Sequence, residues 1–117
     1  MVEQEVRRLS RTLRGGDVAL TVTIGDGQLG GSSLKLQGEP IGPVGDIVDV
    51  DIGSASRLDG RELEVRTLVA DVNLQSNLTE VTYDFTGVAE RSQTLAHRVA
   101  DDDNAVIYIV TFLFEAP

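Results

Sequence analysis

The chain has 117 residues, a net charge of −9 and no cysteine. This length is one domain's worth, and the lack of cysteine excludes disulfides, thiol catalysis and thiolate metal sites. Aromatic residues make up only 4% of the chain, with no tryptophan. We therefore expect an aliphatic core and few stacking platforms for bases or sugars.

The charge is unevenly distributed along the sequence. Residues 1–16 hold four arginines and two glutamates, which gives +2 and leaves −11 for the rest of the chain. So acidic a body repels phosphate backbones, which argues against nucleic-acid binding. No apolar run is long enough to span a membrane, so we expect no membrane partner either.

Residues 2–14 have apolar side chains at helical spacing. Val2, Val6, Leu9 and Leu13 follow one another at intervals of four, three and four residues, which would place them on one face of a helix. Gly15 and Gly16 would end such a helix. This pattern predicts an N-terminal amphipathic arm or helix in residues 1–16, followed by one β-domain in residues 17–117.

The β-domain is predicted from apolar residues that alternate with polar ones. The alternating segments are 18–24, 34–36, 48–52, 63–72, 81–86, 95–99 and 105–115. A β-bulge near Arg66 and Thr67 would keep Leu68 and Ala70 on the inward face, and residues 39–45 are interpreted as a loop. The pattern predicts an all-β fold, an antiparallel β-sandwich or flattened barrel of about seven to eight strands with a short N-terminal helix or arm.

The last segment, 105–115, is apolar on both faces. Such a strand must be covered on both sides, in the middle of a sheet or in a subunit interface. Period-two placement also predicts the core. The residues expected to be buried are Leu20, Val22, Val50, Val65, Val81, Tyr83, Val99, Val110 and Phe112.

Candidate sites for chemistry are few. His97 is the only histidine, and its alternation with Leu95 and Val99 predicts an inward-facing residue beside apolar surface, without a catalytic partner. Asp101, Asp102 and Asp103 form the best calcium candidate, but they lack the glycine and the distant glutamate of an EF-hand loop. We therefore expect an ordinary acidic turn, no metal, no cofactor and no catalytic residues.

These observations favour a non-enzymatic structural or protein-interaction subunit that self-associates into a homo-oligomer. The alternative is a small ligand- or carbohydrate-binding module, possibly calcium-assisted; a carboxylate enzyme is the least favoured class. A basic arm beside an acidic body suggests an arm that docks on its own sandwich or on a neighbouring copy, and salt would then weaken the contact in part. The expected interaction residues are Val2, Val6, Arg7, Leu9, Arg11 and Leu13.

Overall fold

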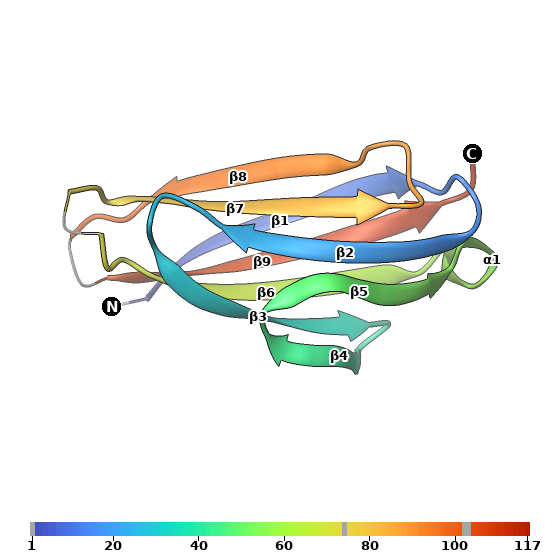
Figure 1. Ribbon diagram of the computed structural model, residues 1–117, viewed down its shortest axis with the longest axis horizontal. Coiled ribbons are helices and arrows are strands. Elements are labelled where there is room, and N and C mark those ends of the chain that lie inside the picture. The colour runs from blue at the N-terminus through green and yellow to red at the C-terminus, as the bar shows by residue number, and fades with distance from the viewer. Residues whose placement is uncertain (1, 74, 102–103) are drawn as a thin grey trace.

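Two β-sheets are stacked face to face in the computed structural model, which describes residues 2–73, 75–101 and 104–117 (Figure 1). The all-β sandwich predicted from the alternation is confirmed, although the described residues form nine strands rather than seven or eight. The elements are β1 (Val2–Thr12), β2 (Asp17–Ile24), β3 (Leu29–Leu36), β4 (Glu39–Gly45), β5 (Ile47–Ser54), α1 (Ala55–Leu58), β6 (Glu62–Ala70), β7 (Leu78–Thr86), β8 (Ser92–Arg98) and β9 (Ala105–Glu115).

The first sheet has the strand order β1-β9-β6-β3-β4, and the second has the order β5-β2-β7-β8. β1 pairs with β9 in parallel, while the other strand pairs are antiparallel. The first and last strands of the chain are therefore neighbours. The molecule measures 44 × 24 × 21 Å, with the strands along its length (Figure 1).

β9 lies between β1 and β6, so its two-sided apolar pattern belongs to a central strand. Its inner face is fully buried from Val106 to Phe114. The Phe112 ring lies 5.4 Å from the Tyr83 ring and 4.9 Å from the Phe85 ring, both edge to face. These aromatic contacts join the two sheets, since Tyr83 and Phe85 belong to β7 of the second sheet.

The predicted N-terminal helix is wrong, because residues 2–12 form strand β1. In a strand, Val2 and Val6 point away from the second sheet, and they are 58% and 55% exposed. Leu9 and Leu13 have the opposite parity and point toward it. The helical stripe is thus split between two faces. β1 pairs with β9 over its whole length, and the sheet thereby supplies its backbone hydrogen bonds. A short isolated helix, by contrast, is only marginally stable in water.

The predicted loop at residues 39–45 is also a strand, β4, at the edge of the first sheet. Pro40 and Pro43 argued against a strand there, because proline cannot donate to a sheet ladder. An edge strand needs hydrogen bonds on one side only, so β4 tolerates both prolines.

The bulge predicted near Arg66 and Thr67 is absent, since β6 keeps an unbroken register with both β3 and β9. The buried position is taken by Thr67, whose hydroxyl lies 2.8 Å from that of Ser32 on β3. Leu68 and Ala70 consequently point outward, and Leu68 is 49% exposed. A polar residue inside and an apolar one outside had produced the apparent change of phase.

Most of the predicted core is buried, but Val22 and Val50 are only partly buried and pack against its margin. The pairing of β2 with β5 shifts register twice. Because of these shifts, β5 buries Ile47 while leaving Val48 69% exposed, contrary to the simple alternation. Residues 55–58 form the one-turn helix α1, which buries Leu58 in the core.

Replacing Phe112 with alanine should lower the free energy of unfolding by about 3–5 kcal/mol, because the change removes a fully buried ring and its aromatic contacts. The measurement is chemical denaturation followed by circular dichroism. Val48→Ala, at an exposed position, should stay within about 0.5 kcal/mol of the wild type. Equal losses for the two variants would contradict the central position of Phe112.

Candidate functional site

His97 bridges the two edge strands β1 and β8, which face each other from different sheets. Its Nδ1 atom lies 2.8 Å from Glu5 Oε1, and its Nε2 atom lies 2.9 Å from Glu3 Oε1. The predicted inward direction of His97 is confirmed, because His97 lies on the partly buried face of β8 with Leu95 and opposite the buried Thr79. Its ring, however, contacts two carboxylates. We call Glu3, Glu5 and His97 the cross-sheet clasp.

The hydrogen bonds of the clasp favour the charged forms of His97 and Glu3. Both imidazole nitrogens face carboxylate oxygens, and only an imidazolium can donate at both. Hydrogen bonds with Glu5 and Glu3 accordingly raise the pKa of His97. The backbone N–H of Ala100 donates to Glu3, and with His97 and the Asn104 amide it lowers the pKa of Glu3 to about 2.

Catalysis receives little support from this arrangement. A general base needs a free ring nitrogen aimed at a substrate proton, and both nitrogens of His97 are engaged. Within the described ranges, no group of three or more His, Cys, Asp or Glu side chains is arranged to hold a metal ion. Through these contacts the clasp links β1 of the first sheet to β8 of the second.

Arg11, also on β1, contacts β8 deeper between the two sheets. The residue is buried, and its guanidinium carbon lies 5.0 Å from the centre of the Phe112 ring. Its Nη2 atom donates to Gln93 Oε1 on β8 at 3.3 Å. Burial lowers the pKa of Arg11, with Glu90 opposing that effect. Arg11 was expected at an interaction surface, but it is buried within its own chain, against Phe112 and Gln93.

The other expected interaction residues are distributed over both faces of β1. Arg7 pairs with Glu5 on its own strand. Leu9 is partly buried against the core and Leu13 is 3% exposed. Val2 and Val6 alone present apolar side chains to solvent. Of the calcium candidates, Asp101 is exposed, and Asp102 and Asp103 lie outside the described residues.

Val2 and Val6 belong to a larger apolar surface on the outside of the first sheet. Strand register places Val6 beside Ile109, and Ile107 beside Leu68. The next row runs from Val2 through Ala105 and Ala70 to Leu29. We call this surface the apolar patch; its residues are Val2, Val6, Leu29, Leu68, Ala70, Ala105, Ile107 and Ile109.

Charged residues adjoin the apolar patch on the same face. Arg8 donates to Glu62 at 2.5 Å, and Arg66 pairs with Glu64 at 2.6 Å. With Lys35 and Glu115, three positive and three negative side chains leave this face without net charge. The outer face of the first sheet is thus nearly neutral in a protein of charge −9.

The outer face of the second sheet has a different character. Its outward positions carry five acidic residues and one arginine, a net charge of −4, and five threonines. The acidic side chains are Asp17, Asp49, Asp51, Glu80 and Asp84, the arginine is Arg98, and the threonines are Thr21, Thr23, Thr82, Thr86 and Thr94. Such a face is well solvated and repels a second acidic molecule.

A groove of about 340 Å³ opens between β2, β3 and the start of β5, next to Ile24, Leu29 and Val48. Among the described residues that line it, none is aromatic. Sugar rings usually stack on aromatic side chains, so the groove gives little support to carbohydrate binding.

Comparison of the chain with protein-family models, with curated proteins and with solved structures finds no match. The part of the chain that the structure describes contains no helix long and apolar enough to cross a membrane.

The clasp should make stability depend on pH near neutrality. Because folding raises the pKa of His97 above 6.5, its stabilising contribution is complete below that value and is lost as pH rises through the raised pKa. Wild type should lose more stability than His97→Gln between about pH 5.5 and about pH 8.5 in urea denaturation. An identical change in both proteins would show that the clasp does not depend on the imidazolium.

Proposed function

We propose that this protein is a non-enzymatic subunit that self-associates through the apolar patch, with a second copy of the same chain as its partner. The proposal rests on one observation above the others: the central strand β9 places the partly exposed Ile107 and Ile109 beside the exposed Val6 and Leu68 on an uncovered sheet face. Contiguous exposed apolar surface of this kind marks an interaction site more often than scattered apolar residues do.

Association through strand edges is disfavoured on the β1 and β8 side. β1 points Glu3, Glu5 and Arg11 toward the second sheet, where they contact β8 residues. Inward-pointing charges on edge strands hinder the addition of a further strand, because that strand would meet charges in place of apolar partners. This edge is closed by side chains of the same molecule.

The opposite edges are blocked by other means. β4 contains Pro40 and Pro43, which offer no N–H to a partner strand. β5 has two register shifts against β2, and Asp49 has a φ of 50° in the left-handed region. Both features disturb the regular backbone that edge pairing requires. The sheet face remains as the route to self-association.

Charge favours the first sheet over the second for contact between two copies. Two molecules of charge −9 repel each other, and repulsion is smallest where the approaching faces are nearly neutral. The first sheet carries no net charge on its outer face and the second carries −4. The Arg8–Glu62 and Arg66–Glu64 pairs neutralise charge within one molecule, so a contact here leaves few charges unpaired.

The face has the size of a small stable interface. Four strands at a spacing of about 4.8 Å, each about eight residues long at about 3.4 Å per residue, project an area of about 500 Å². Protruding side chains make the accessible area larger, which brings it near the roughly 600–800 Å² per partner of standard interfaces. A symmetric dimer buries the same patch on both copies.

Leu68→Glu should shift the protein from dimer to monomer in sedimentation equilibrium, because it buries a carboxylate at the centre of the patch. The fold should persist, since Leu68 is exposed in one molecule. Thr82→Glu adds the same charge to the outer face of the second sheet and should leave the mass unchanged. A monomeric wild type, or a Leu68→Glu variant with wild-type mass, would refute the proposal.

The dependence of association on salt distinguishes a contact through the apolar patch from the docking of a basic arm, which the sequence predicted. Raising ionic strength from about 0.05 M to about 0.5 M screens the repulsion between two acidic subunits. A contact through the apolar patch should therefore hold or tighten, as measured by the dimer dissociation constant. Docking of a basic segment on an acidic surface would instead weaken, and that result would favour the arm over the patch.

A further inference from the structure

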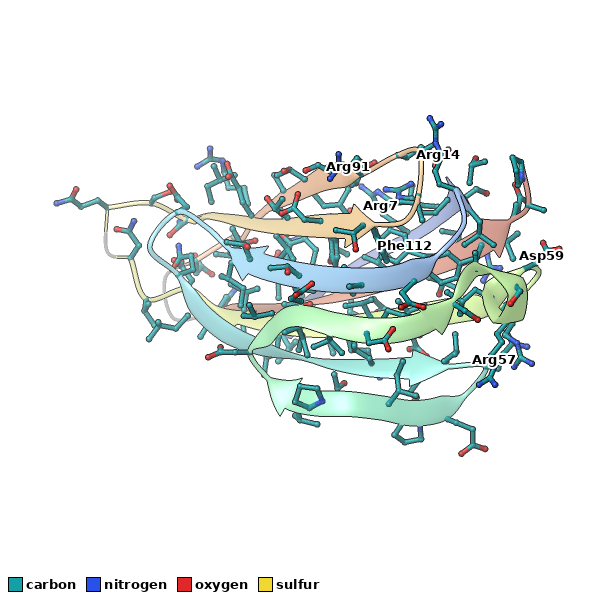
Figure 2. The ribbon with its side chains drawn as sticks, turned by 45° about the vertical axis from the view of Figure 1, so that its right-hand side comes forward. Arg7, Arg14, Arg57, Asp59, Arg91 and Phe112 are labelled. Carbon is teal, nitrogen blue, oxygen red and sulfur yellow. The ribbon has the colours of Figure 1, made fainter. Side chains whose placement is uncertain are left out.

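Two arginines beside α1 line a recess at the end of the sandwich where the chain crosses from the second sheet to the first. Arg57 lies in the last turn of α1, and Arg61 precedes β6; Arg57 is labelled beside the helix in Figure 2. The recess holds about 280 Å³, and its apolar walls come from Leu36, Ile52 and Leu58. The site is separate from the apolar patch, and the inference does not rest on the proposed self-association.

The charges of this recess are unbalanced. Arg8 and Arg66 form ion pairs with glutamates on the first sheet. By contrast, the side chains of Arg57 and Arg61 form no hydrogen bond or ion pair with the described residues, and those that line the recess include no acid. A chain with 19 acidic residues thus leaves two guanidinium groups unneutralised at one recess.

The nearest acidic residues in sequence have other partners. Asp59 accepts a hydrogen bond from the Ala116 N–H at 3.0 Å and lines a different recess. Glu62 is paired with Arg8, and Asp51 accepts from the Gly53 N–H at 3.0 Å. These three acids are therefore engaged elsewhere, which leaves Arg57 and Arg61 available to an anion at the recess.

We propose that the recess binds a small organic carboxylate. Guanidinium groups present paired donors that match the two oxygens of a carboxylate. Leu36, Ile52 and Leu58 would cover a short apolar body, which distinguishes this ligand from a fully hydrated inorganic anion. The volume is at the lower limit of typical ligand pockets, about 300 Å³, so the site suits a molecule of a few carbon atoms rather than a nucleotide.

Isothermal titration calorimetry with sodium hexanoate tests this assignment. We expect saturable binding at one site per chain, weakened at least about tenfold in both Arg57→Gln and Arg61→Gln, because each change removes a charge-assisted contact. Arg98→Gln removes the same charge from the outer face of the second sheet and should change the affinity by less than about twofold. Circular dichroism should confirm that all variants fold.

Two further probes test the charged group and the apolar body of the ligand separately. Hexan-1-ol has the apolar body without the charge, and inorganic phosphate has the charge without the body; both should bind at least about tenfold more weakly than hexanoate. Hexanol binding as tightly as hexanoate would refute the role of the arginines, and phosphate binding as tightly would refute the role of the apolar walls. Absence of saturable hexanoate binding, or equal weakening in Arg98→Gln, would overturn the proposal.

Discussion

The packing of β9 against β7 is the interaction on which the rest of this structure depends. Phe112 meets Tyr83 and Phe85 edge to face at the centre of the interface between the sheets. The same strand pairs with β1 on one side and β6 on the other, so it fixes the first sheet laterally as well as against the second. With three phenylalanines, two tyrosines and no tryptophan in the chain, this cluster uses most of the aromatic side chains available.

The position of β9 also explains why the first strand is needed. A central strand with an apolar inner face requires a neighbour on each side, and β1 is the neighbour that closes the sheet. β1 is itself an edge strand, and its inner face must cover the margin of the core while discouraging further strands. Glu3, Glu5 and Arg11 meet both needs because β8 supplies partners for each of them. The polar residues between β1 and β8 are thus a consequence of the edge position of β1.

The outer faces of the two sheets differ in charge and in apolar area. One is acidic and rich in threonine, a residue that suits an exposed strand and interacts well with water. The other combines self-paired charges with an uncovered apolar area. In a protein with this net charge, self-association is limited by repulsion. An interface therefore gains most where charge is already balanced, and the outer face of the first sheet meets that condition.

Period-two alternation is a local property, so it is enough to predict the all-β class, the aliphatic interior and the two-sided character of residues 105–115. Prediction from sequence failed where one-dimensional patterns conflict with pairing: residues 2–14 match a helix, yet the unpaired side of β9 makes them a strand. At Thr67 and Leu68, alternation suggested a bulge, whereas Ser32 on β3 supplies the hydroxyl that lets Thr67 stay inside. The clasp and the Arg57–Arg61 recess join residues from separate segments of the chain. Neither is predictable from the chain alone, because contacts between sheets depend on strand order, which no local pattern encodes.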